Sequence, residues 1–213
     1  MSDQIDPAKH LQQVLVQLLP LWPDTSPQLH YQNCWQLLVA VVLSAQCTDD
    51  QVNKVSPQLF ACWPTPADLG SADFDQVATV IHSTGFFRNK AANIIALSRQ
   101  IADQYGGQVP EQLSTLLSLP GVGRKTANLV VSACFDQPGI IVDTHVLRIC
   151  YRLGLGDGKQ ADRTERLLAD ILEPAQYTAA SHALNRHGKF VCLARKPTCN
   201  ACVIRLLCPS VQA

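Results

Sequence analysis

Apolar residues recur at intervals of three and four along most of the chain, which is the spacing of one face of an α-helix. The first such run begins at Leu11 and ends before Pro20, and residues 35–43 are apolar on every side, as in a buried central helix. Further helices are expected at residues 73–82, 89–105, 111–119, 124–134, 163–172 and 177–191, with helix starts near Thr65 and Asp143. Only residues 140–142 suggest a short extended piece. The sequence therefore predicts an all-α protein.

The composition is typical of a folded protein outside the membrane. Of the 213 residues, 47% are hydrophobic and 16% are charged, which is enough for one large core or two small ones. The longest apolar run, residues 37–45, is well short of the roughly 18 residues that a membrane-spanning helix needs. The first ten residues carry two aspartates and lack the apolar stretch of a signal peptide. We therefore expect a cytoplasmic protein with reduced thiols.

The net charge is zero, but the charges are unevenly distributed. Residues 1–115 hold 5 basic and 10 acidic residues, whereas residues 116–213 hold 12 and 7, so the two parts carry −5 and +5. No acidic residue follows Glu173, while five lysines and arginines do. The C-terminal part can thus attract an anion such as nucleic acid, although the same asymmetry also fits ordinary solvated surface charge.

A glycine-containing segment, LPGVGRKTAN at residues 119–128, lies between two expected helices and joins them by a tight hairpin. Gly121 and Gly123 permit backbone conformations closed to other residues, and the N-terminus of the next helix adds the positive end of its dipole. Arg124 and Lys125 follow directly. Such a turn can bind a phosphate of DNA. The simpler interpretation is a helix–helix turn that uses glycine for its geometry alone.

Nine cysteines are present, and four of them crowd into the last 22 residues with the spacing C-x6-C-x2-C-x5-C. These four are Cys192, Cys199, Cys202 and Cys208. Four thiolates can saturate a tetrahedral zinc ion or the four irons of a cubane cluster. The spacing places one cysteine at a helix end and three in the following loop. It therefore predicts a structural metal centre and leaves zinc and iron–sulfur open.

Asp143 stands directly before an expected helix, where aspartate is a good N-cap. If the fold brings it beside Lys125, a lysine–aspartate pair can carry out nucleophilic chemistry at a sugar carbon. A site that is partly desolvated at a helix N-terminus would favour the neutral amine.

Together these segments resemble the endonuclease III family. The resemblance rests on LPGVGRKTAN, on VDTH at residues 142–145, on the four-cysteine tail with ARKPTC inside it, on LSAQCTD at residues 43–49 and on the G-x-x-x-N-K-A-x-N-I-I stretch at residues 85–95. It implies a two-lobed helix-hairpin-helix DNA glycosylase fold. Residues 26–137 would form a six-helix barrel domain, with the helix-hairpin-helix at about 109–134. Residues 1–25 and 138–213 would form an iron–sulfur cluster domain, with the cysteine loop at 192–208.

The resemblance also implies a base excision repair activity. The enzyme would flip oxidised pyrimidines out of duplex DNA and excise them, and would then cleave the strand at the abasic site by β-elimination. Lys125 matches the nucleophile, which forms a Schiff base with the opened sugar, and Asp143 matches the catalytic acid. The four cysteines match the ligands of a 4Fe-4S cluster, zinc being the alternative. The implied protein is a monomer associated with chromosomal DNA.

DNA contacts are implied for nine residues: Gln46, Phe86, Gly121, Val122, Gly123, Arg124, His145, Arg195 and Lys196. Gln46 matches the residue that fills the gap left by the flipped base. Two positions depart from the pattern. Phe86 stands where bacterial relatives often have a leucine wedge, and Leu117 stands where an acid is expected just before the hairpin.

Two other functions fit part of the sequence. Mismatch adenine glycosylases share the hairpin and the cysteine tail, but their catalytic glutamate would fall near Ala40, where no carboxylate is present. A non-catalytic helix-hairpin-helix protein stabilised by zinc would use Arg124 and Lys125 only for phosphate contacts and Asp143 only as a cap. That alternative gives no reason for Lys125, Asp143 and Gln46 to occur together.

Overall fold

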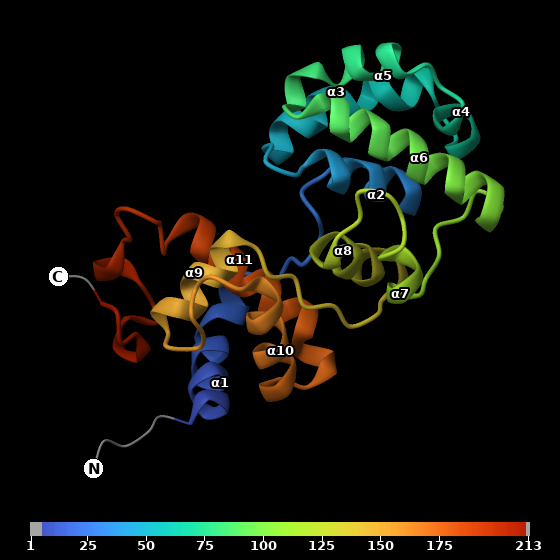
Figure 1. Ribbon diagram of the computed structural model, residues 1–213. Helices are drawn as coiled ribbons and strands as arrows, with labels where there is room; N and C mark the ends of the chain where they lie inside the picture. Colours follow the sequence, from blue (N-terminus) through green and yellow to red (C-terminus); the bar gives the residue numbers. More distant parts are fainter. Residues whose placement is uncertain (1–5, 212–213) are drawn as a thin grey trace. The chain divides into compact units, whose positions relative to one another are not determined.

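The computed structural model describes residues 6–211, and the chain divides into two compact units (Figure 1). One unit is Pro27–Asp136; the other combines Met1–Ser26 with Gln137–Ala213. Between residues 6 and 211 all regular secondary structure is helical, so the prediction of an all-α protein is confirmed. We call the two units the hairpin unit and the cysteine unit, after the segments that they contain.

The hairpin unit is built around one buried helix, α2. Its helices are α2 (Cys34–Leu43), α3 (Asp49–Cys62), α4 (Pro66–Gly70), α5 (Phe74–Val80), η2 (His82–Thr84), α6 (Phe87–Tyr105), α7 (Leu113–Leu116) and α8 (Arg124–Phe135). Every residue of α2 from Trp35 to Leu43 is buried, as its mostly apolar sequence predicts, and Gln36 is the one polar residue among them. Helices α6 and α8 both pack against α2, so the hairpin before α8 is attached to a rigid core.

Side-chain caps explain where several of these helices begin. Asn33 caps α2, Thr65 forms a capping box with Asp68 at α4, and Asp73 caps α5. Helix α3 does not follow from the hydrophobic pattern. Its start carries a clear signal, the Thr48 cap followed by two aspartates in the first turn, but Pro57 inside the helix obscured the pattern.

The cysteine unit joins the beginning and the end of the chain in one core. It contains α1 (Pro7–Leu18), η1 (Leu19–Leu21), α9 (Thr144–Arg152), α10 (Ala161–Ile171), η3 (Pro174–Gln176), α11 (Tyr177–Phe190), η4 (Cys199–Ala201) and η5 (Arg205–Leu207). The apolar face of α1 is buried against α11 and residues near η5. Residues 140–142 form no strand; they are buried without regular structure, and the Ile141 N–H donates to Ser181 Oγ at 3.1 Å.

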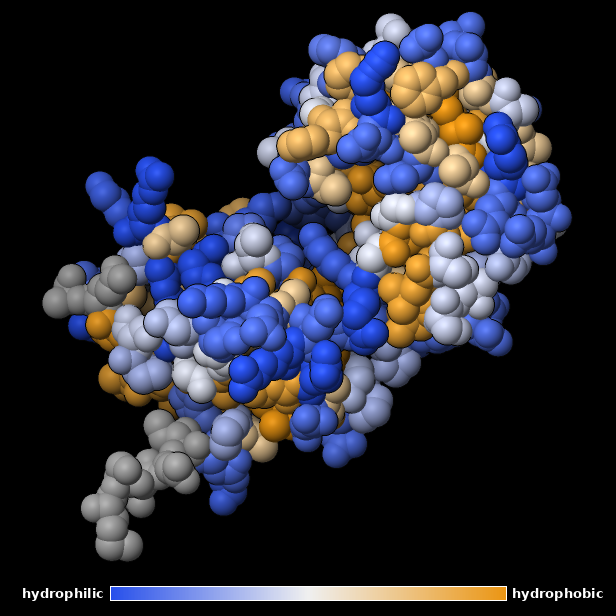
Figure 2. Space-filling model, viewed as in Figure 1, coloured by the Kyte–Doolittle hydropathy of each residue, from blue (hydrophilic) through white to orange (hydrophobic). Residues whose placement is uncertain are grey.

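The visible surface of each unit is mostly hydrophilic with scattered apolar side chains, as is usual for a folded protein in water (Figure 2). Of the helices between residues 6 and 211, none combines the length and the apolar character that a bilayer crossing requires.

Candidate active site and cysteine pocket

The hairpin turn at Leu119–Val122 is closed by its own backbone. The Val122 N–H donates to the Leu119 carbonyl at 3.1 Å, and Gly121 has φ +76°. Proline at the second position and a positive-φ glycine at the third are typical of a type II turn. A Cβ on Gly121 would lie 2.8 Å from Asn93 of α6, so glycine is needed both for conformation and for space. The Val122 side chain is buried in the core; a DNA contact from Val122 therefore stays a prediction.

Lys125 is exposed at the second position of α8, directly beyond the Gly123 N-cap. The buried face of α8 carries Ala127, Asn128, Val130 and Val131. These residues attach the helix to the core, so Lys125 in its first turn points to solvent. The helix N-terminus favours anions, so a phosphate of DNA would be attracted to this end. Lys125 is exposed, so the partial desolvation of its amine stays a prediction.

Gln46 and Phe86 share an unusual backbone conformation. Both have positive φ, +52° at Gln46 and +49° at Phe86, in a chain where Asp136 is the remaining non-glycine residue of this kind among residues 6–211. Both are exposed, and Phe86 presents 66% of its surface to solvent. A left-handed, exposed aromatic residue combines backbone strain with apolar surface open to water, a combination that occurs at binding sites.

Asp143 is the N-cap of α9, as its position before the helix predicts. Its Oδ1 accepts the N–H groups of His145 and Val146, both at 2.9 Å, and its Oδ2 accepts Asn185 Nδ2 at 2.8 Å. The carboxylate is therefore held in one orientation by two helices of the cysteine unit. Lys125 lies in the other unit, so the pairing of the two side chains stays a proposal.

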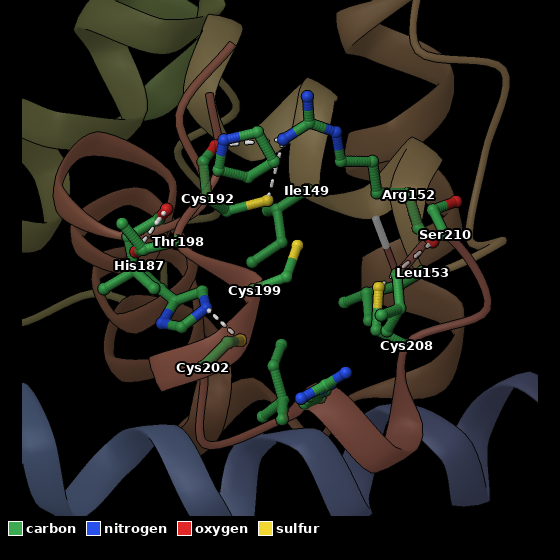
Figure 3. Close-up of a pocket in the computed structure, with 15 residues that line it drawn as sticks. Ile149, Arg152, Leu153, His187, Cys192, Thr198, Cys199, Cys202, Cys208 and Ser210 are labelled. Carbon is green, nitrogen blue, oxygen red and sulfur yellow. Dashed lines mark hydrogen bonds between the residues drawn. The ribbon is translucent and has the colours of Figure 1, made fainter. Parts of the chain in front are cut away.

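Four cysteines line one pocket of the cysteine unit. Figure 3 shows Cys192, Cys199, Cys202 and Cys208 around this pocket, which α9, α11 and the C-terminal segment enclose. Arg152 binds the first cysteine: its Nη1 donates to Cys192 Sγ at 3.1 Å and to the Leu193 carbonyl at 2.8 Å. On another side, His187 Nε2 lies 3.4 Å from Cys202 Sγ.

Burial shapes the chemistry of this pocket. It raises the pKa of the Cys202 and Cys208 thiols, and nearby cysteines raise it further because neighbouring thiolates repel one another. His187, with 1% of its surface exposed, has its pKa lowered by burial. Four thiols around one pocket can supply the four thiolate ligands of an iron–sulfur cluster, and the N–H that Arg152 directs at Cys192 Sγ can donate to a ligand sulfur. Between residues 6 and 211 no three His, Cys, Asp or Glu side chains form a group that could hold a single metal ion.

The remaining predicted contact residues lie close to this pocket. Arg195 and Lys196 are exposed on the loop between Cys192 and Cys199. His145 lies on α9, where its Nδ1 accepts from Arg148 Nη2 at 3.1 Å. Arg148 also donates to the Cys192 carbonyl at 3.0 Å and to the Gly188 carbonyl at 2.6 Å, and thereby connects the start of α9 to the cysteine loop.

Several residues of these sites were missed from sequence. Asn185, Arg148, Arg152 and His187 contact predicted site residues that are distant in sequence, 42 positions away in the case of Asn185 and Asp143. Only spacing along a helix offered a signal: Arg148 and Arg152 are one helical turn apart on α9, which is typical of two side chains on one face.

Comparisons with known proteins identify the class to which this fold and these sites belong. Residues 39–174 match the family described as "HhH-GPD superfamily base excision DNA repair protein". A solved thermostable thymine-DNA glycosylase, 22% identical, shares the fold with a TM-score of 0.84 over 95% of this chain and 96% of that one. The class is that of helix-hairpin-helix base excision repair proteins.

More similar proteins specify the family. Endonuclease III from Synechocystis sp. is 46% identical over 202 residues, which cover 94% of this chain and 92% of the relative. Endonuclease III from Escherichia coli K12 is 40% identical over 94% of this chain and 95% of the relative. A solved trapped endonuclease III–DNA covalent intermediate, 39% identical, gives a TM-score of 0.91 and covers 95% of this chain and 96% of that one.

The chain belongs to the endonuclease III family. It is an enzyme of base excision repair, a DNA glycosylase with lyase activity. The non-catalytic alternative is therefore wrong. The adenine glycosylase alternative gains no support either, because Ala40 is fully buried in α2 and offers no carboxylate.

Proposed function

We propose that this enzyme removes oxidised pyrimidines from duplex DNA and cleaves the resulting abasic site through a Schiff base on Lys125. The main support for this role of Lys125 is that its amine is exposed in the first turn of α8, directly after the glycine hairpin. One structural neighbour was solved as a trapped covalent intermediate with DNA. Lys125 gives this chain an accessible amine for a bond of the same kind.

In the proposed reaction the neutral amine of Lys125 attacks C1′ of the extruded nucleotide while the C1′–base bond breaks and the base leaves with the bonding electrons and a proton. The sugar ring then opens to an imine. Loss of a C2′ proton and departure of the 3′ phosphate by β-elimination cut the strand. The fixed carboxylate of Asp143 would stabilise positive charge on the sugar and accept a proton from the lysine.

The hairpin and the two strained turns would position the duplex. Gly121, Gly123 and Arg124 would contact a phosphate at the α8 N-terminus. Gln46 would fill the space left by the flipped base, and Phe86 would stack against the opposite strand as a wedge. Phe86 is flatter and larger than leucine, so we expect it to change the preference for the opposite base.

We assign Cys192, Cys199, Cys202 and Cys208 as ligands of a 4Fe-4S cluster rather than of zinc. A cubane takes one thiolate at each of four separate irons, so its ligands surround a pocket, as these four do. When bound, the cluster would fix the loop that carries Arg195 and Lys196, and these cations would meet phosphates. Our proposal also includes a monomer that acts on chromosomal DNA in the cytoplasm, with the hairpin unit and the cysteine unit as its two lobes.

Borohydride trapping tests the assignment of Lys125. A duplex containing either an oxidised pyrimidine or an abasic site should give a covalent adduct with the wild type, and Lys125→Gln should abolish the adduct while duplex binding persists. Lys54→Gln, at an exposed lysine of the same unit, should trap like the wild type.

The two substrates separate the two parts of the proposal. Trapping of Lys125→Gln at the wild-type level would overturn the nucleophile. Trapping of the wild type at the abasic site but never at oxidised pyrimidines would overturn the substrate class and leave the lyase assignment intact. Iron and sulfide analysis of the purified protein tests the cluster, and one equivalent of zinc in colourless, anaerobically isolated protein would overturn it.

A further inference from the structure

Lys90 is a buried cation that the proposed chemistry does not use. It lies in the first turn of α6, within the G-x-x-x-N-K-A stretch, and only 4% of its surface is exposed. Its Nζ donates to the Thr84 carbonyl at 2.7 Å. Burial lowers the pKa of this amine. A buried lysine is rare and costly unless a specific partner compensates it, and here the Thr84 carbonyl is that partner.

The acceptor of this hydrogen bond lies immediately before a strained turn. Thr84 is itself buried, with 2% of its surface exposed, and its hydroxyl donates to the Ile81 carbonyl at 2.8 Å. The next two residues both have positive φ, +68° at Gly85 and +49° at Phe86. Such a conformation persists only where the surroundings hold it. By fixing the Thr84 carbonyl, Lys90 fixes the direction in which the chain leads to Phe86.

A second turn with a positive-φ residue, Gln46, lies near Lys90. The Cys47 side chain is near enough to act on the charge of Lys90, and Cys47 directly follows Gln46. The Cys47 N–H donates to the Ser44 carbonyl at 3.0 Å and closes that turn. Nearby, Gln51 Nε2 of α3 donates to Ser83 Oγ of η2 at 2.7 Å. The segments that carry Gln46 and Phe86 are thus connected by an exposed hydrogen bond at the surface and by buried Lys90 below it.

We propose that Lys90 is a positioning residue for base extrusion: its buried ammonium holds the Thr84 carbonyl beside the Gln46–Cys47 turn, so that Gln46 and Phe86 enter the duplex in a fixed relation. This inference rests on the proposed roles of Gln46 and Phe86 in opening the duplex. Unstacking a base costs a few kcal/mol. Two side chains that insert together offset more of this cost when their spacing is fixed before binding, because less conformational freedom is then lost on binding.

The test compares excision, for which a base must be unstacked, with cleavage at an abasic site, where no base has to be unstacked. Lys90→Met keeps the length of the side chain and removes its charge and donors. We expect excision of an oxidised pyrimidine from a duplex to slow by about tenfold or more, while cleavage of the same duplex with an abasic site changes by less than about threefold. Fluorescence of 2-aminopurine beside the lesion should show the same loss of extrusion directly. Lys54→Met makes the identical change at an exposed lysine and should alter neither rate.

The outcomes separate this inference from the proposed function. Equal slowing of both reactions in Lys90→Met, with Lys54→Met normal, would show a general structural role and overturn the inference, and so would an unchanged extrusion signal. Gln46→Ala and Phe86→Ala serve as references. If both variants leave the ratio of the excision rate to the abasic-site cleavage rate unchanged, the proposed roles of these side chains fail. If they lower the ratio and Lys90→Met does not, only the inference about Lys90 fails.

Discussion

Asp143 combines two tasks in one carboxylate. One oxygen caps α9 and the other accepts a hydrogen bond from Asn185, so the carboxylate is held in one rotamer. A cap needs only a hydrogen-bond acceptor, which asparagine also supplies, whereas charge stabilisation at a developing sugar cation needs the negative charge.

Asp143→Asn therefore should slow base excision by about a hundredfold while duplex binding and the folded structure are retained, as measured by single-turnover kinetics and binding titration. The double variant Asp143→Asn/Asn185→Asp is the matched control, because it keeps a carboxylate–amide hydrogen bond between α9 and α11 and moves the charge to position 185. We expect it to stay slow. Recovery of the wild-type rate would mean that the carboxylate need not belong to residue 143.

His182 of α11 makes the cysteine unit sensitive to acid. Burial lowers its pKa below the 6.5 of an exposed histidine, and Arg186 lowers it further, against the opposing effect of Asp24. As the pH falls through about 6.5, His182 is therefore protonated in the unfolded chain before it is protonated in the folded one. The free energy of unfolding decreases below that pH and does not depend on His182 above it.

His182→Gln should remove this contribution. Urea unfolding at about pH 8 and about pH 5.5 should show a larger decrease of the unfolding free energy in the wild type than in the variant. An equal decrease in both proteins would show that His182 has no part in the acid sensitivity.

At the scale of the element, the hairpin depends on one glycine more than on the other. Gly121 has positive φ and faces Asn93, whereas Gly123 has φ −96° and no heavy atom within 4 Å of an added Cβ. Gly121→Ala should destabilise the hairpin unit by about 2–4 kcal/mol, from left-handed strain and the collision with Asn93.

Gly123→Ala provides the comparison within the same hairpin. It should cost at most about 1 kcal/mol, because alanine is only a poorer N-cap there. Thermal unfolding of both variants measures the difference. Equal destabilisation would contradict the role of space and conformation at Gly121.

The helices and the candidate site were predictable to different degrees. Periodicity and caps predicted α1, α2, α6, α8 and α11, because these signals are local. Helix α3 was not predicted because it contains a proline, although its inner face is buried in the core. Lys125, Asp143 and the four cysteines could be named from motifs. Arg152, Asn185, His187 and Lys90 could not, because each acquires its role from a partner that only folding brings near.

For the whole molecule, the two separate cores predict a local response to loss of a cluster ligand. The buried residues of the hairpin unit and of the cysteine unit form two distinct hydrophobic clusters. Cys199→Ala should abolish the iron content and speed hydrogen exchange in α9 and α11, while exchange in α2 and α6 stays slow. Cys62→Ala, at an exposed cysteine of α3, should change neither. Uniformly faster exchange throughout the chain would contradict this independence.

The shared core of the two chain ends has a consequence for synthesis. The apolar face of α1 packs against α11 and residues near η5, and more than 150 residues separate the end of α1 from the start of α11 along the chain. Pro27–Asp136 contains its own core and can fold as soon as it leaves the ribosome. Helix α1 can therefore dock fully only after α11 and η5 have been made, and until then its leucine-rich face is exposed to solvent.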